Sequence, residues 1–441
     1  MAGTTKAPWT GNSVTLRNAR LPNAALGLSS GGVKPATILV TDGVVAEIGT
    51  DIPPVPGEPA YDCQGGLVVP AFVDVHTHLD KGHIWGRTQN PDGSFLGALR
   101  SVAADRRSHW SAADIERRMD FALRCAFAHG TAALRTHLDS DAAQRPVIWP
   151  IVDALRQSWR GRIELQAVAL IGPDQMLDLD EVRAVAGWIK PFGGILGGAI
   201  AAHPHARTAI ANVVRAAAEF DLDLDLHCDE TLDPDASTLL HLAEAIGDTG
   251  YDGRTQAGHC CALSNQPEAV VARTIEAVAE AGVAVVSLPL CNMYLQDRQP
   301  GGLVRTPRHR GIAPVKELKA AGVAVAVASD NTRDPFYAYG DLDMIEVFRE
   351  TARIAQIDHP SDQAWDWLRS LTSVPAATAR FAYDATVAVG APADLVVLRA
   401  RTWSELHSRP QADRIVVRSG RAIDTTLPDY RELDGLIGAP S

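Results

Sequence analysis

A pair of histidines separated by one residue stands in the stretch "VDVHTHLDKG", at residues 73–82. On a β-strand, side chains two residues apart point to the same side, so the imidazoles of His76 and His78 would share one face. Two imidazoles on one face, directly after the apolar run "GLVVPAF", are suited to binding one metal ion. The alternative is two incidental polar residues at a strand end.

Three further apolar stretches end in side chains of the same chemical kind. "DLDLDLHCDE" ends with His227 and Glu230, "AGHCC" contains His259, and "AVAVASDN" leads to Asp330. Each has a plainer interpretation: Glu230 as a solvated loop acid, His259 as a core histidine, and Asp330 as a helix N-cap. The strand-end set is therefore His76, His78, His227, His259 and Asp330, with Glu230 nearby. Three imidazoles and a carboxylate would suit one divalent ion such as Zn²⁺ or Fe²⁺. The ligand types alone do not choose between these two metals.

The elements that would position these residues alternate between strands and helices over about residues 68–384. Eight strand candidates occur, and helical segments lie between most of them. For example, the helix in "SAADIERRMDFALRCAFAHG" has Ser111 as its expected N-cap and Gly130 at its C-terminus. Eight β/α repeats predict an α/β fold of the (β/α)8 TIM-barrel type, with its active site at the C-terminal ends of the strands. The strand candidates are "GLVVPAFVDVHTH", "TAALRTHLD", "RIELQAVALIG", "GGILGGAIAAH", "DLDLDLHCD", "TQAGHCC", "VAVVSLPLCN" and "VAVAVASDN".

The strict alternation of acid and leucine in "DLDLDLHCDE" gains a meaning in such a barrel. The leucines would pack on the helices, whereas Asp223, Asp225 and His227 would point into the barrel. Buried acids are costly unless they are paired or bind a metal, so an inward row of acids requires partners. A strand with one face in bulk solvent is the alternative interpretation.

The two ends of the chain resemble each other and differ from the middle. "ATILVTDGVVAEIG" near the N-terminus and "DRIVVRSGRAID" near the C-terminus both have the pattern of two strands joined by a tight turn. We therefore expect residues 1–67 and 385–441 to form one small β-sandwich domain. Residues 68–384, which form the barrel, would be inserted between its two parts.

Composition restricts the partners and the cellular location. The 441 residues are 46% hydrophobic and 21% charged, with a formal net charge of −12. This excess of acid argues against nucleic acid or an anionic membrane as the main partner. The six cysteines form no C-x-x-C pair, and the first residues lack a signal-peptide pattern. We expect a cytoplasmic protein that acts on a small molecule, and we keep a homo-oligomer as an open alternative to a monomer.

Taken together, these motifs resemble the amidohydrolase superfamily and, within it, the cytosine deaminase-like branch, related to the N-isopropylammelide amidohydrolases. The resemblance runs along nearly the whole chain, including the split β-sandwich. It implies that His76, His78, His227 and Asp330 hold the metal, that Glu230 carries protons, and that His259 polarises the reacting centre. The motifs are "AFVDVHTHLDK", "RTHLD", "DLHCDE", "AGHCC", "PRHRGIAPVKEL" and "SDNTRDPFYAYGDLDM".

Three departures from the family pattern bear on the reaction. Many superfamily members bridge two metals with a carboxylated lysine, and the matching strands here carry none, which implies a single divalent ion. Cytosine deaminases read the pyrimidine with a glutamine after the third strand, where this chain has Gly172. The second acid after the metal aspartate is replaced by Asn331, as in the N-alkylammelide hydrolases.

Substrate contacts are expected from Asn331 and Phe336 after the eighth strand, with a helix cap and a loop anchor as the plainer roles. Lys81 and Trp85, in the first loop after a strand, could line the pocket or belong to a surface loop. Three arginines after the seventh strand are interpreted as a solvated or subunit-contacting loop. They are Arg305, Arg308 and Arg310.

The predicted function is metal-dependent hydrolytic deamination of the exocyclic amino group of a cytosine-like nitrogen heterocycle. Asp330 and Glu230 would move protons, and His259 would stabilise the tetrahedral centre. One alternative is hydrolysis of an N-alkylamino-triazine or cyclic-amide C–N bond, which Asn331 and the missing glutamine favour. A second alternative is a metal-binding barrel without catalysis, which the loss of a ligand or of Glu230 would favour; none is missing.

Overall fold

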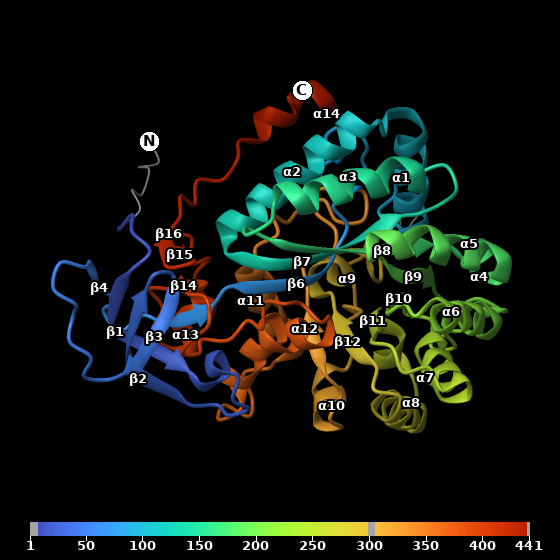
Figure 1. Ribbon diagram of the computed structural model, residues 1–441. Coiled ribbons are helices and arrows are strands. Elements are labelled where there is room, and N and C mark those ends of the chain that lie inside the picture. Colours follow the sequence, from blue (N-terminus) through green and yellow to red (C-terminus); the bar gives the residue numbers. More distant parts are fainter. Residues whose placement is uncertain (1–7, 299–304, 439–441) are drawn as a thin grey trace.

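The protein is described by a computed structural model over residues 8–298 and 305–438 (Figure 1). Its centre is a sheet of eight parallel strands in sequential order. The strands are β6 (Phe72–Thr77), β7 (Thr131–Asp139), β8 (Glu164–Ile171), β9 (Ile195–Ile200), β10 (Leu224–Cys228), β11 (Thr255–His259), β12 (Ala284–Ser287) and β13 (Val325–Val327). The first and last strands meet where Thr77 bridges Asp330, and the Asp330 amide donates to the His76 carbonyl at 2.9 Å. The predicted (β/α)8 barrel is confirmed.

Helices surround this barrel and cover the outer faces of its strands (Figure 1). In chain order, the α-helices of the described residues are α1 (Phe95–His109), α2 (Ala112–His129), α3 (Arg145–Ser158), α4 (Pro173–Leu177), α5 (Leu179–Ile189), α6 (Ala206–Phe220), α7 (Thr238–Thr249), α8 (Glu268–Glu280), α9 (Pro289–Leu295), α10 (Val315–Ala320), α11 (Met344–Ala355), α12 (Ser373–Thr378), α13 (Trp403–Ser408) and α14 (Asp434–Ile437). The short helix α13 lies toward the left of Figure 1, outside the ring of helices around the barrel. Among the described residues, no helix is both long and apolar enough to cross a lipid bilayer.

Helix α2 shows how local sequence sets these boundaries. The Ser111 hydroxyl accepts a hydrogen bond from the Asp114 amide, and Gly130 ends the helix with a φ of 99°. A left-handed φ of this kind is costly for residues with a Cβ atom, which explains the glycine. The apolar positions Ile115, Met119 and Leu123 are all buried, as the helical period predicts.

Two four-stranded sheets lie beside the barrel, at the left of Figure 1. One has the order β3-β2-β1-β4, and the other has the order β16-β15-β14-β5. Their strands are β1 (Val14–Pro22), β2 (Val33–Thr41), β3 (Val44–Gly49), β4 (Ala60–Asp62), β5 (Val68–Pro70), β14 (Leu395–Val397), β15 (Ile415–Arg418) and β16 (Arg421–Ala422). Strands from the two chain ends therefore share a sheet, since β5 pairs with β14. The division of the chain at residues 67 and 385 stays a prediction.

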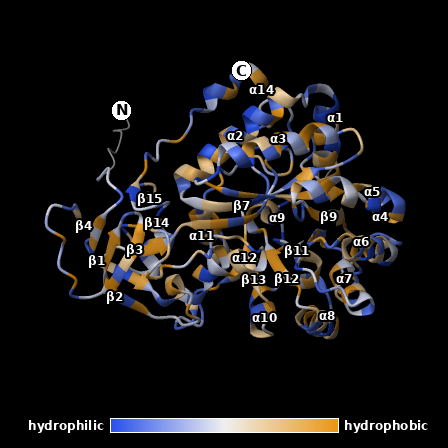
Figure 2. Cartoon of the chain, viewed as in Figure 1, coloured by the Kyte–Doolittle hydropathy of each residue, from blue (hydrophilic) through white to orange (hydrophobic). Residues whose placement is uncertain are grey.

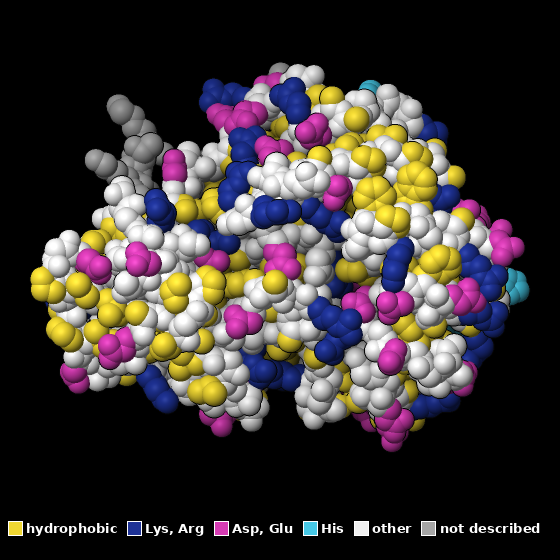
Figure 3. Space-filling view, in the orientation of Figure 1, with side chains coloured by type: hydrophobic (Ala, Val, Ile, Leu, Met, Phe, Trp, Pro, Cys, Tyr) yellow, Lys and Arg dark blue, Asp and Glu magenta, His cyan; other side chains and the backbone are white. Residues whose placement is uncertain are grey.

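Apolar side chains fill the space between strands and helices, and the strands in both parts of the molecule are largely hydrophobic in Figure 2. On the face shown in Figure 3, basic and acidic side chains are interspersed rather than gathered into a field of one sign. All six cysteines are buried as free thiols.

The C-terminal segment crosses from β16 back to the barrel and ends in α14 beside α2 (Figure 1). Leu433, which is buried, packs against Phe121 and Cys125 of α2. Arg124 forms an ion pair of 2.7 Å with Glu432. The last described turn is thus fixed to the first helices of the barrel.

Candidate active site

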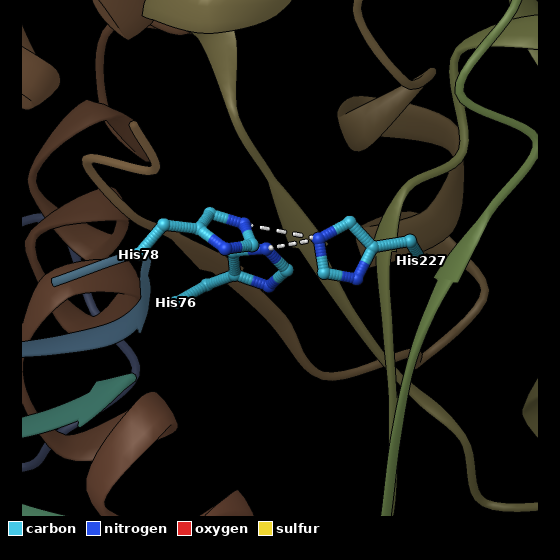
Figure 4. A group of neighbouring side chains, drawn as sticks. All are labelled: His76, His78 and His227. Atoms are coloured by element: carbon cyan, nitrogen blue, oxygen red, sulfur yellow. Dashed lines mark hydrogen bonds between the residues drawn. The ribbon is translucent and has the colours of Figure 1, made fainter. Parts of the chain in front are cut away.

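The centre of the site is a group of three imidazoles at the C-terminal ends of β6 and β10 (Figure 4). The Nε2 atom of His227 lies 3.2 Å from Nε2 of His76 and 3.1 Å from Nε2 of His78. Oδ1 of Asp330 lies 3.3 Å from Nε2 of His78 and 3.8 Å from Nε2 of His76. All four residues are at most 5% exposed. The structure therefore brings together the four residues that the sequence suggested as ligands.

These separations match what one tetrahedral ion would require. Ligand atoms bound at 2.0–2.1 Å from a zinc ion lie about 3.3–3.4 Å apart. Both carboxylate oxygens of Asp330 are buried without a hydrogen-bond partner, an expensive arrangement for a polar group unless a cation compensates. Without a cation, burial raises the pKa of Asp330 to about 8. A divalent ion would favour the ionised carboxylate instead, so the residues present fit a metal.

The imidazoles are held in the neutral form that metal binding needs. Burial, together with the neighbouring imidazoles, lowers the pKa of His76 well below its ordinary value, and burial dominates for His78 and His227 as well. Neutral imidazole nitrogens carry the lone pair that binds a metal. The His76 ring fits because β11 has Gly258 beside it, where a Cβ atom would lie 2.8 Å from Cε1 of His76.

His259 and Glu230 lie next to the metal ligands. Nδ1 of His259 is 3.5 Å from Oε1 of Glu230 and accepts a hydrogen bond of 2.9 Å from the Asn292 amide. The proton of the ring is therefore on Nε2, which is buried and has no partner in the protein. Burial lowers the pKa of His259 to about 3, so the ring is neutral and can donate from Nε2.

The surroundings of Glu230 favour the protonated form of its carboxyl group. Burial raises the pKa of its carboxyl group well above the usual range, and the neighbouring Asp330 adds to the shift. Lys81 acts in the opposite direction. A carboxyl group with a raised pKa can serve as a proton donor near pH 7.

Backbone strain is concentrated at two of these strand ends. His259 has a φ of 70°, and Asp330 has a φ of 66°. Both values lie in the left-handed region, which residues with a side chain seldom adopt. Strained backbone held in place by the surrounding fold is common where side chains must be aimed at a reaction centre.

A cavity opens directly above this group. Apolar side chains from α1 form one wall, and the Phe95 ring makes an edge-on contact with the Phe336 ring at 5.5 Å between centroids. Lys81 is buried in the wall and forms an ion pair of 2.7 Å with Asp139. The lining residues are His78, Lys81, Phe95, Leu99, Val102, Asp139, Leu170, Ala199, His227, Glu230, His259, Asn331 and Phe336.

Some of the other residues suggested from the sequence line the cavity, and others do not. Asn331, Phe336 and Lys81 line it, whereas Gly172 and Trp85 are not among its lining residues. Gly172 follows the end of β8 and precedes α4, and Leu170, which lies within β8, lines the cavity instead. The register of β8 thus places the residue two positions earlier at the height of the site.

The arginine loop after the seventh strand lies apart from the cavity lining. Arg305 forms an ion pair of 2.5 Å with Asp297, while Arg308 and Arg310 are exposed. The predicted solvated loop therefore describes Arg308 and Arg310 but not Arg305, which is half-buried. A subunit contact in this loop stays a prediction.

The row of inward acids is shorter than expected. Asp225 lies inside the barrel and pairs with Arg135 at 2.7 Å, and both side chains are at most 2% exposed. Asp223 precedes β10 and lies at the opposite rim, half-buried, where it accepts a hydrogen bond from the Arg254 amide at 2.9 Å. Of these two acids, only Asp225 has a partner inside the barrel, because β10 begins at Leu224 and Asp223 precedes it.

Sequence reasoning missed His137 and Asn292. His137 packs against His76 with 3.9 Å between ring centroids, and its Nε2 atom is 3.7 Å from Oδ1 of Asp225. Its position in "RTHLD", two residues from Arg135 on β7, gives it the same period-two signal that identified the other strand-end histidines. Asn292 has no comparable signal, because its contact with His259 depends on how α9 packs.

Comparison of the sequence with known protein families identifies the class of protein to which this chain belongs. The model of the amidohydrolase family matches residues 124–423, about two thirds of the chain, and the chain belongs to that family. It is a hydrolase that acts on C–N bonds, of the hydrolytic deaminase kind.

Particular relatives are similar over almost the full length. A pterin deaminase of Rhizobium rhizogenes is 50% identical over 432 residues, covering 96% of this chain and 97% of the relative. The N-isopropylammelide isopropyl amidohydrolase of a Pseudomonas species is 25% identical, covering 82% and 87%. A crystal structure of 5-methylcytosine deaminase from Klebsiella pneumoniae superposes with a TM-score of 0.78 at 23% identity, covering 93% and 97%, and shows the shared fold.

Proposed function

We propose that the protein is a metal-dependent deaminase of pterins, which are fused bicyclic heterocycles with a 2-amino-4-oxopyrimidine ring. The observation that carries this proposal is the 50% identity to a pterin deaminase across nearly both whole chains. The reacting unit of a pterin is an amino-substituted carbon between two ring nitrogens, as in isocytosine; the amino-bearing carbon of cytosine is bonded to one ring nitrogen only. The proposal therefore keeps the predicted reaction and replaces the one-ring substrate with a two-ring one.

The proposed metal ligands are His76, His78, His227 and Asp330, which would hold one ion. Strands β8 and β9 carry no lysine that could bridge a second ion. Three nitrogen ligands and one oxygen ligand suit zinc or iron(II). When bound, such an ion supplies a water molecule with a pKa near 7 and so a nucleophile at neutral pH.

Three side chains would carry the reaction forward. Asp330 accepts the proton of the attacking water, and Glu230 donates a proton to a ring nitrogen next to the reacting carbon. Nε2–H of His259 donates a hydrogen bond to the oxygen that develops negative charge there. Asp330 then passes the proton it accepted to the amino group, the C–N bond to that group breaks, and the carboxylate of Glu230 takes back a proton from the new hydroxyl group. One water molecule is consumed, and the products are the oxo heterocycle and ammonia.

The cavity walls support a flat aromatic substrate. Phe95 and Phe336 offer ring surface for stacking, and Lys81 offers a buried cation for a carbonyl oxygen. Gly172 does not line the cavity, so we expect nothing at position 172 to read the heterocycle as the family's glutamine does. Polar recognition then falls to Asn331, Lys81 and Glu230.

A substrate panel tests this proposal. The metal-loaded enzyme is incubated with pterin, isocytosine, cytosine and N-isopropylammelide, and ammonia and isopropylamine are both quantified. Ammonia released fastest from pterin supports the proposal, and no ammonia from pterin at full metal content refutes it.

Hydrolysis of an N-alkylamino-triazine is the second candidate, because Asn331 replaces the acid of cytosine deaminases. Isopropylamine released faster than any ammonia in the same panel would favour this function.

A further inference from the structure

Asp334 is a buried carboxylate that organises the loop after β13. Its Oδ1 atom accepts hydrogen bonds from the backbone amides of Phe336 at 2.8 Å and Tyr337 at 3.1 Å. Its Oδ2 atom accepts a hydrogen bond of 2.7 Å from Nδ2 of Asn331. The side chain of Asp334 is fully buried. One carboxylate therefore fixes both the loop and the side chain of Asn331.

The contact with Asp334 determines which end of the Asn331 amide is available. Because Nδ2 of Asn331 donates to the carboxylate, Oδ1 is the end left for another partner. The Cys291 thiol lies 3.8 Å from Oδ1 of Asn331, and a thiol is a weak donor. Asn331 lines the cavity and is 5% exposed. A buried amide oxygen with so weak a partner is ready to accept a hydrogen bond from a ligand.

We propose that Asn331 reads an N–H group of the substrate through Oδ1, and that Asp334 is the positioning residue that sets this polarity. The inference rests on the proposed function and adds a rule for its substrates. The heterocycle must present an N–H, on the ring or on the amino group, on the side of the reacting carbon that faces Asn331. Glu230 serves a ring nitrogen that accepts a proton, so the two residues distinguish the two nitrogens of the ring.

The substitution Asp334→Asn reverses the polarity without removing the loop contacts. The oxygen of the new amide can still accept from Phe336 and Tyr337, while its nitrogen becomes a donor toward position 331. The Asn331 amide must then turn its oxygen to that donor and present NH₂ to the cavity. We expect kcat/KM for pterin to fall about tenfold to a hundredfold, with metal content and the unfolding temperature close to those of the wild type.

The exchanged pair N331D/D334N is the matched control. It places an amide nitrogen opposite a carboxylate again, with the donor and acceptor exchanged, and a free oxygen faces the cavity once more. We expect it to recover most of the kcat/KM lost in D334N, to within about threefold of the wild type. If Asp334 only held the loop, D334N would keep the loop contacts and lose little activity, and the second substitution would recover none. Asn331→Leu, which has neither donor nor acceptor, should lose activity like D334N.

Binding of pterin, followed by its fluorescence, is measured beside turnover for every variant. Wild-type kcat/KM and affinity in D334N, or a double variant as impaired as the single one, would overturn the inference. Should D334N fail to fold, undiminished activity and affinity in N331L would overturn it equally. Failure of the wild type to deaminate pterin counts against the proposed function alone, because the affinities of the variants still decide the role of Asn331 and Asp334.

Discussion

Replacement of Arg135 by methionine should destabilise the protein in a way that depends on pH. The guanidinium group donates to Asp225 at 2.7 Å and to Gln256 at 2.9 Å, and it contacts Gln166 at 2.7 Å. All of this lies inside the barrel, below the metal ligands. Methionine keeps much of the volume but leaves the carboxylate of Asp225 buried and without its cation. Breaking a buried pair in this way costs about 3–5 kcal/mol of unfolding free energy.

The sign of the pH dependence follows from the pKa of Asp225. Burial raises the pKa of this carboxyl group to about 6, although Arg135 acts in the opposite direction. A raised carboxyl pKa means that stability falls as pH rises from the unfolded pKa to the folded one, and then stays level. Without Arg135 the folded pKa rises further, so the fall continues above pH 6. The deficit of R135M should then grow by about 1.4 kcal/mol per pH unit.

Urea unfolding followed by circular dichroism at pH 5.5, 7.0 and 8.5, with the same metal content, measures this deficit. The double variant R135M/D225N is the control, because it has no buried charge to leave unpaired and should show a small deficit that is independent of pH. A deficit of R135M below about 1 kcal/mol at pH 8.5, or one that does not change with pH, would refute the reasoning.

Three further changes test the site and its support. Glu230→Gln should lower turnover about 10²- to 10⁴-fold while inductively coupled plasma analysis still finds one ion per chain; wild-type turnover would remove Glu230 from the mechanism. Dialysis against a chelator should abolish ammonia release and lower the melting temperature, and zinc or iron(II) should restore both; activity of ion-free protein would contradict the ligand assignment. Leu433→Ala should cost about 2–5 kcal/mol in urea unfolding, because Leu433 packs on Phe121 and Cys125; a loss below about 0.5 kcal/mol would show that α14 contributes little.

The features that sequence predicted well share one property, a period that identifies a face. The spacing of His76 and His78 placed both imidazoles on one side of β6, and the cap signals of Ser111 and Gly130 located α2. Eight apolar stretches with intervening helices sufficed for the barrel. These patterns extend over a few residues each, so they can be recognised from the sequence without knowledge of the tertiary contacts.

The features that sequence misplaced depend on height along the barrel and on packing between distant elements. Period two shows that Asp223 and Asp225 share a face, but the start of β10 decides that only Asp225 lies inside. The same stagger places Leu170 rather than Gly172 at the cavity. Phe95 comes from a helix whose contact with Phe336 depends on tertiary packing, which local spacing does not encode.

The pairing of β5 with β14 has a consequence for biosynthesis. The ribosome releases β5 early, but its partner strand β14 is made only after the whole barrel, and α14 follows later still. The edge of β5 that pairs with β14, and the side chains of Phe121 and Cys125 on α2 that pack against Leu433, therefore stay exposed while the rest of the chain is translated. Contacts of such long sequence separation slow folding and leave exposed edges prone to aggregation. Production of this enzyme in a heterologous host should accordingly benefit from slow expression and abundant chaperones.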